Sequence, residues 1–238
     1  MRQRAKPAPP PSGNRLLAAL PPDDRERLRC QGEWRELTPR QTLIVPGRRI
    51  DYVYFLEDGI VSLLQPLQDG AMIEIALVGR EGLIGVPVVL GAPVSQAEAI
   101  VQTPGHALRL RASVLRQEMT RHPALLDLLL RYVLALHVQV AQAVACNGRH
   151  PVPKRLARWL LAAGDRIGGE ALALSHETLA EMLGMRRASV TVALGALRRA
   201  GLIHNSPGHI AILDAKELEA SACECYRVVK DEYARLLP

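Results

Sequence analysis

The residues with the clearest chemical potential lie in the segment from Ser175 to Gly201. Two adjacent guanidinium groups, Arg186 and Arg187, are followed closely by the hydroxyl side chains of Ser189 and Thr191. A planar guanidinium can donate two parallel hydrogen bonds to guanine O6 and N7, and a hydroxyl suits a backbone phosphate. These residue types can therefore read DNA, provided that a helix presents them to a groove.

The surrounding residues predict that helix. Ser175 can cap a first helix, and Gly184 can leave it through a left-handed conformation that only glycine adopts at low cost. A second helix is expected from Arg187 to Ala200 and a hairpin from Leu202 to Ile212. The residues expected beneath the two helices are Leu179, Leu183, Met185, Val190, Leu194 and Leu197. This order predicts a winged helix-turn-helix, whose second helix enters a major groove.

The distribution of charge supports the same interpretation. The chain has 238 residues and a net charge of +6. The segment 149–210 holds nine Lys and Arg against four Asp and Glu, whereas 30–111 holds seven against nine. A basic last third suits a polyanion, although a solvated surface in an arginine-rich chain is the alternative. Aromatic residues are only 3%, which argues against a stacking platform for single strands.

The first half of the chain has the pattern of a β domain. Residues 1–13 are proline-rich and are expected to be a disordered tail. Two short helices, Asn14–Leu20 and Asp23–Arg29, are expected next, each capped by its first residue. Short apolar runs separated by Gly, Pro and Asp turns then predict an antiparallel barrel or jelly roll. The runs are 34–37, 42–45, 52–56, 59–64, 72–77, 97–101 and 106–110.

A helix of 25 residues is predicted from Pro123 to Asn147, after a shorter one at Ala112–Thr120. Its apolar residues fall into two stripes. One alternates spacings of four and three, as a parallel helix partner requires, and is made of Leu129, Val133, Leu136, Val140 and Ala143. The other, made of Leu126, Leu130 and Val144, is expected to face the strands. Dimerisation explains two apolar faces best, and burial within one chain is the alternative.

From about Asn14 to Asp214 the chain resembles the Crp/Fnr family of bacterial transcription regulators. The resemblance is specific in the helix-turn-helix and architectural in the strands, where 46–59 resembles an early hairpin of that family. It implies an α+β chain with an N-terminal antiparallel β jelly roll of the cyclic-nucleotide-binding type, a long dimerisation helix and a C-terminal winged helix-turn-helix. The expected units are a tail (1–13), a sensor domain (14–121), the helix (122–148) and a DNA-binding domain (149–238).

The resemblance also implies roles on DNA. Arg187 stands where the family carries a base-reading arginine, and Ser189 matches a phosphate-binding hydroxyl. Ala188 replaces a frequent glutamate, and Val192 replaces a further arginine, so the half-site is expected to differ from that of the cyclic-AMP receptor. The other candidate DNA contacts are His176, Arg186, Thr191, Arg198 and Arg199.

The same resemblance bears on what the sensor domain binds. The family's cyclic-nucleotide cassette has a glutamate for the ribose and an arginine for the phosphate. The corresponding positions are Leu83, followed by Ile84, and Ser95, followed by Gln96. Leucine accepts no hydrogen bond and serine carries no charge, so an anionic phosphate would lose its charged partner. Tight binding of cyclic AMP is therefore not expected, and the sequence does not name the effector.

The four cysteines suggest neither a disulfide framework nor a cluster. Cys30 is alone in the N-terminal region where the family's oxygen sensors hold an iron–sulfur centre, so no such cluster is expected. Cys146 is expected to be a buried apolar residue. Cys223 and Cys225, without further ligands, are too few for zinc, and no metal site is expected. His137 is expected to be a packed or interface histidine, with haem ligation as the alternative.

Other classes of protein find little support. The apolar run 125–145 is interrupted by charged and polar residues, which argues against a membrane span, and no apolar secretory segment is present near the start. Neither a P-loop nor a metalloprotease motif suggests an enzyme. We expect a cytoplasmic homodimer that binds pseudo-palindromic double-stranded DNA and contacts RNA polymerase. The alternative is a ligand-binding module that reuses the fold without DNA.

Overall fold

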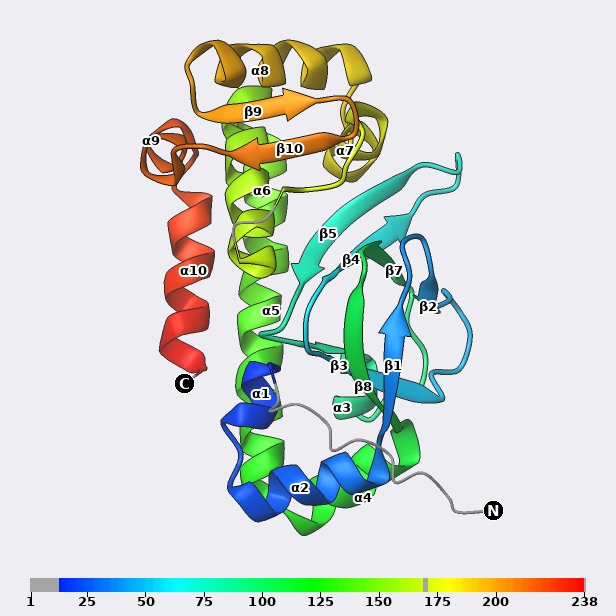
Figure 1. The fold of residues 1–238 in the computed structure, drawn as a ribbon. Coiled ribbons are helices and arrows are strands. Elements are labelled where there is room, and N and C mark those ends of the chain that lie inside the picture. Colours follow the sequence, from blue (N-terminus) through cyan, green and yellow to red (C-terminus); the bar gives the residue numbers. More distant parts are fainter. Residues whose placement is uncertain (1–12, 169–170, 238) are drawn as a thin grey trace, which may run out of the picture.

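The computed structural model describes residues 13–168 and 171–237. A β domain lies beside one long helix, and a smaller domain of helices and a hairpin sits at the far end of that helix (Figure 1). The predicted α+β architecture is confirmed. The tail expected at 1–13 lies outside the described residues except for Gly13.

Eight antiparallel strands form the β domain in two four-stranded sheets, ordered β1-β8-β3-β6 and β2-β7-β4-β5. Their inner faces enclose a core that includes Phe55, Val61, Val101 and Leu108, each at most 1% exposed. The strands are β1 (Glu33–Leu37), β2 (Thr42–Ile44), β3 (Tyr52–Leu56), β4 (Ile60–Pro66), β5 (Met72–Val78), β6 (Leu83–Ile84), β7 (Glu98–Thr103) and β8 (Gly105–Arg111). Seven were predicted. The two-residue β6 was not, because it is too short to show alternation.

Four short helices lie toward the lower end of the β domain in Figure 1: α1 (Arg15–Ala18), α2 (Pro22–Gln31), α3 (Val86–Val89) and α4 (Ala112–Arg121). The predicted cap Asn14 is confirmed, since its side chain accepts a hydrogen bond from the Leu17 amide. The predicted cap Asp23 is wrong. Helix α2 has already begun at Pro22, because proline suits the first helical turn, so Asp23 lies inside that turn.

Helix α5 (Pro123–Arg149) runs along the whole molecule beside the β domain (Figure 1). Its most apolar window has a mean hydropathy of 1.6, so by length and composition alone it qualifies as a membrane span. Its contacts are instead those of a core helix in a globular fold. Gln139 is buried and donates to the Leu77 carbonyl of β5, and Tyr132 donates to the Leu83 carbonyl.

Most residues of the two apolar stripes of α5 face the opposite way from the prediction, whereas Leu126 packs against the core of the β domain as predicted. Leu129 and Leu136, expected at a dimer seam, are 0% and 6% exposed and belong to the core of the β domain. Leu130 and Val144, expected against the strands, are 43% and 68% exposed. The stripe that faces solvent is therefore offset by one residue and is made of Leu130, Leu134, His137, Ala141 and Val144, which we call the outer stripe.

The C-terminal domain begins at α6 (Val152–Ile167) after the bend at His150 and Pro151. Helices α7 (His176–Leu183) and α8 (Arg187–Arg199) and the hairpin β9 (Ile203–Ser206) and β10 (His209–Ile212) follow. The expected strand near Leu172 is a single bridge to Ile210. Two helices at the end of the chain, α9 (Ala215–Ser221) and α10 (Cys225–Leu236), complete the domain, and α10 packs along α5 (Figure 1).

Candidate nucleic-acid interface

The turn between α7 and α8 has the geometry that the sequence predicts. The Ser175 hydroxyl accepts a hydrogen bond from the Thr178 amide, at 3.1 Å, and so caps α7. Gly184 ends that helix at a φ of +58°. The Met185 amide then donates to the Ala180 carbonyl, at 2.8 Å, which closes the turn. A side chain at residue 184 would strain this left-handed backbone, which explains the glycine.

Helix α8 presents one buried and one open face. Val190, Leu194 and Leu197 are at most 6% exposed and pack on α6 and α7, as predicted. On the open face, the structure brings together the exposed side chains of Arg186, Arg187, Ala188 and Thr191, while Ser189 is half-buried beside them. Arg198 and Arg199 are exposed at the other end of the same helix, two turns or more from the first group.

Arg187 is held only loosely in the absence of a ligand. Its Nε lies 3.4 Å from Glu177 Oε2, and the two side chains are 68% and 60% exposed. Exposed ion pairs of this kind contribute at most about 1 kcal/mol. The guanidinium is therefore available to exchange this carboxylate for an acceptor on DNA.

His176 connects three elements of this surface. Its Nδ1 lies 3.0 Å from the Thr191 hydroxyl of α8, and its Nε2 lies 3.2 Å from Asn205 Nδ2 of the hairpin. The ring is half-buried by these contacts. His176 is thus placed to position Thr191 and the hairpin relative to each other.

One exposed residue of the open face was not among the DNA contacts predicted from the sequence. Val192 stands at a position where the resemblance implied a lost arginine, yet its side chain is 70% exposed. It lies with Ala188 and Ala196 on an apolar strip of α8. An exposed valine on this helix suits the methyl group of thymine, and its placement four residues after Ala188 is the signal that could have found it.

Comparison with known proteins agrees with this geometry. Residues 154–221 match the Crp-like helix-turn-helix domain, and residues 34–122 match the cyclic nucleotide-binding domain. The transcriptional regulator LdrP of Thermus thermophilus is 30% identical over 195 residues, which cover 77% of this chain and 93% of LdrP. The chain belongs to the Crp/Fnr family.

Other relatives are more distant. The global nitrogen regulator of Synechocystis sp. is 28% identical over 172 residues, covering 68% of this chain and 76% of that protein. The structure of FixK2 from Bradyrhizobium japonicum is similar with a TM-score of 0.70 at 18% identity, covering 81% of this chain and 98% of the other. TTHA1359, a Crp/Fnr regulator from Thermus thermophilus, has a TM-score of 0.61 at 21% identity, covering 80% and 98%. These two structures support the fold. The family is one of DNA-binding transcription regulators.

In this Crp/Fnr chain, the residues at the cyclic-nucleotide cassette positions have other roles. Leu83 and Ile84 are 1% and 0% exposed and belong to the core of the β domain. The Ser95 hydroxyl bonds the backbone of Ala97, accepting from its amide and donating to its carbonyl, while Gln96 is exposed. These side chains therefore serve packing and turn formation.

A cavity of about 320 Å³ lies where the β domain meets the DNA-binding domain. Strand β5 and helices α5, α6 and α10 surround it, and its polar lining includes Glu74, Glu81, Gln139, Arg158 and Arg166. Its volume is at the lower end of the range of small-molecule sites. A ligand there would contact both domains at once.

Two carboxylates at this junction, the half-buried Glu74 and the buried Glu81, link the DNA-binding domain to the β domain. The Trp159 indole N–H of α6 donates to Glu74 Oε1 at 2.7 Å, and the Ser62 hydroxyl donates to Glu74 Oε2 at 2.6 Å. Burial raises the pKa of Glu74 to about 7, against the two hydrogen bonds, which lower it. The second carboxylate, Glu81, lies 2.9 Å from Arg166 Nε, with both side chains 10% exposed.

Proposed function

We propose that the protein is a homodimeric, sequence-specific transcription regulator that binds a pseudo-palindromic operator without cyclic AMP. The observation that carries this proposal is the exposed first turn of α8, where Arg186 and Arg187 stand unburied on a packed helix-turn-helix. A helix so presented fits a major groove. The site of action is the cytoplasm, with RNA polymerase as the further partner expected of such a regulator.

On DNA, we assign one kind of contact to each of seven residues at the start of α8 and along it. Arg187 reads a guanine, because its planar fork matches O6 and N7. Ser189 binds a phosphate, and Arg186 binds phosphate beside it. Ala188 and Val192 contact thymine methyl groups. Arg198 and Arg199, at the far end of the helix, add sequence-independent affinity.

A second copy of this chain is the partner proposed for the outer stripe of α5. Its residues are separated by four, three, four and three positions, which is the repeat of a helix paired with a parallel helix. Leu130, Leu134 and Val144 expose apolar surface along the stripe. Pairing two such helices would set two copies of α8 about one DNA turn apart.

The proposed independence from cyclic AMP rests on the cassette positions. Leu83 and Ser95 offer no carboxylate for a ribose hydroxyl and no cation for a phosphate, and both are already engaged in the fold. The charge-assisted bonds that offset desolvation of an anion are therefore missing at these positions.

Selection from randomised operators, performed without cyclic nucleotide, tests the proposal. The wild-type chain is expected to select a palindromic consensus. Arg187→Ala should weaken binding by roughly 1–3 kcal/mol per half-site and relax one symmetric base-pair position. The matched control is Arg186→Ala, which should lower the salt dependence by about one unit per subunit and keep the consensus.

Three results would count against the proposal. If Arg187→Ala keeps the wild-type consensus and loses only general affinity, Arg187 is not the base reader. If the wild-type chain binds operator DNA only after cyclic AMP is added, independence from cyclic AMP is wrong. Failure to retain any DNA at low salt would favour a ligand-binding module instead.

Dimerisation is tested by a charge on the outer stripe. Leu134→Asp should convert the dimer to a monomer, because two carboxylates would meet in an apolar seam. Leu67→Asp is the matched control, since Leu67 is also 45% exposed but lies beyond β4 in the β domain. Light scattering at tens of micromolar reads the mass. A wild-type monomer that still binds its operator tightly would contradict the dimer.

A further inference from the structure

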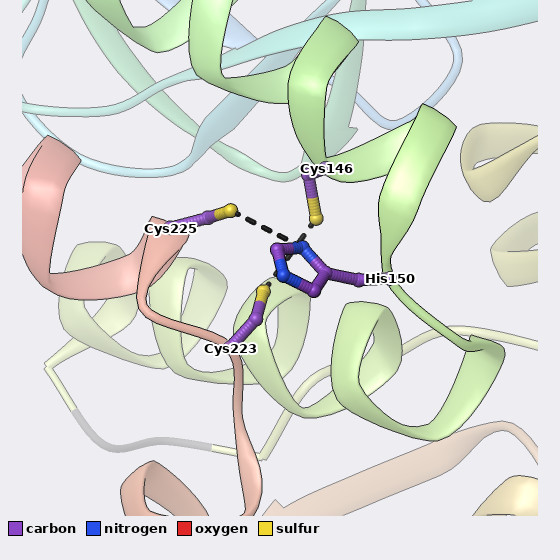
Figure 2. Close-up of side chains that lie close together, drawn as sticks. All are labelled: Cys146, His150, Cys223 and Cys225. Carbon is purple, nitrogen blue, oxygen red and sulfur yellow. Dashed lines mark hydrogen bonds between the residues drawn. The ribbon is translucent and has the colours of Figure 1, made fainter.

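Four side chains from distant parts of the sequence meet at the bend between α5 and α6. They are Cys146, His150, Cys223 and Cys225, and their sulfur and nitrogen atoms all lie within 4.8 Å of one another (Figure 2). The sequence led us to expect that Cys223 and Cys225 lack further ligands. That expectation is wrong. Because α10 packs along α5, the thiols of Cys223 and Cys225 lie beside Cys146 and His150 at the C-terminal end of α5.

The spacing of these atoms matches the edges of a coordination tetrahedron. Cys146 Sγ and Cys223 Sγ are 3.5 Å apart, and Cys225 Sγ is 3.5 Å from His150 Nδ1. With Zn–S bonds of about 2.3 Å, two sulfurs of a tetrahedral site are separated by roughly 3.8 Å. These two distances are within a few tenths of an ångström of such an edge, and the remaining ones, at up to 4.8 Å, would shorten by about 1 Å at most to hold an ion.

The imidazole is already oriented for such a role. His150 directs Nδ1 to the cluster, while its other nitrogen, Nε2, lies 3.3 Å from the Glu224 carboxylate. Metal-bound histidines almost always donate their second N–H to an outer acceptor of this kind. Gln142 supports the neighbouring ligand in the same way, since its Nε2 donates to Cys225 Sγ at 3.1 Å.

The surroundings suit a closed, thiolate-rich site. Cys146, Cys223 and Cys225 are at most 4% exposed and form a small cluster of their own. The positive charges of Arg155 and Arg158 act on these sulfurs. Three thiolates and a neutral imidazole around a divalent ion carry a net charge of −1, which these guanidinium groups offset.

We propose that Cys146, His150, Cys223 and Cys225 bind one Zn²⁺ ion in a tetrahedral Cys₃His site. Soft sulfur ligands select zinc among abundant divalent ions, and four protein ligands leave no open position, which is typical of a structural site. The ion would join the end of α5 to the connection between α9 and α10. It would thereby fix the C-terminal helix at the hinge that carries the DNA-binding domain.

Metal analysis of the full chain, expressed with zinc and purified without chelators, tests the site. The wild-type protein should contain about one zinc per chain. Cys223→Ser and Cys225→Ser should each lower this content strongly. Cys30→Ser is the matched control, because Cys30 is exposed on α2 and should leave the zinc content unchanged. A wild-type chain that holds no more zinc than Cys223→Ser would overturn the proposal.

Two further measurements keep the test independent of folding. Glu224→Ala removes an exposed carboxylate that lies outside the cluster and should weaken zinc binding on the order of 10-fold in a chelator competition. Cobalt added to the metal-free wild-type chain should give the intense visible bands of a tetrahedral site and thiolate charge-transfer absorption. Iron–sulfur absorption in the purified protein, or a metal-free chain whose Cys146–Cys223 disulfide persists when a thiol reductant is present, would refute a zinc site.

Discussion

Arg166→Met should lower the free energy of unfolding by about 3–5 kcal/mol, because it leaves the Glu81 carboxylate buried without its counter-charge. Arg166 Nε lies 2.9 Å from Glu81 Oε1. The same guanidinium also donates to the Ala162 and Leu77 carbonyls. Its loss would therefore remove hydrogen bonds to both sides of the domain junction, although Gln139 still donates to the Leu77 carbonyl. Urea denaturation at pH 7 measures the effect.

Two controls separate this effect from the loss of any ion pair. Arg235→Met removes a pair with Glu232 of similar N–O distance, 2.7 Å, at the surface of α10, and should change stability far less because water screens this pair. The double variant Glu81→Gln with Arg166→Met should recover much of the lost stability, since no isolated charge remains buried. If the double variant is no more stable than Arg166→Met, uncompensated charge is not the cause.

The free energy of unfolding of the wild-type chain should fall as the pH rises, and Glu74→Gln should abolish this fall. Burial raises the pKa of Glu74 from 4.5 to about 7, so between these values the native state holds a proton that the unfolded state has released. Stability therefore falls as pH rises through this window, by about 3 kcal/mol in total. Glutamine is neutral at every pH, its carbonyl oxygen still accepts from Trp159, and its amide nitrogen can donate to the Ser62 oxygen in place of the bond that Ser62 donates to the carboxylate.

Unfolding midpoints at pH 5 and pH 8 measure this difference. Glu74→Gln should resemble the wild-type chain at pH 5 and exceed its stability at pH 8. Glu36→Gln, at an exposed glutamate of β1, should change neither midpoint appreciably. Equal pH dependence in Glu74→Gln and the wild-type chain would show that Glu74 does not carry a raised pKa.

The elements set by local signals could be predicted from the sequence. Ser175 and Gly184 mark the ends of α7 through their own backbone preferences, and the structure confirms both. The strands followed from alternation and turn residues. The face of α8 proposed to contact DNA was predicted from the position of this helix after the turn. Its residues, apart from the half-buried Ser189, are exposed in the structure, and the contacts themselves stay predictions.

What depends on tertiary packing could not be predicted in the same way. Leu129 and Leu130 are both apolar, and periodicity cannot tell which stripe its own chain covers, so the two faces of α5 were exchanged. The contact between Cys146 and Cys223 joins residues 77 positions apart. No local sequence pattern predicts that α10 packs along α5 and brings them together. The hydrogen bond between Trp159 and Glu74 likewise joins residues far apart in the sequence.

Helix α5 is unbroken over 27 residues, a length of roughly 40 Å. Tyr132 is hydrogen-bonded to the β domain in the first half of this helix, and Cys146 contacts Cys223 and Cys225 of the DNA-binding domain near its C-terminal end. A continuous helix resists compression and twisting along its axis far more than a loop does. A change in the contacts of Tyr132 or Gln139 with the β domain would therefore displace α5 as a rigid body. The bend at His150 would move with the helix, and no part of α5 would need to unfold.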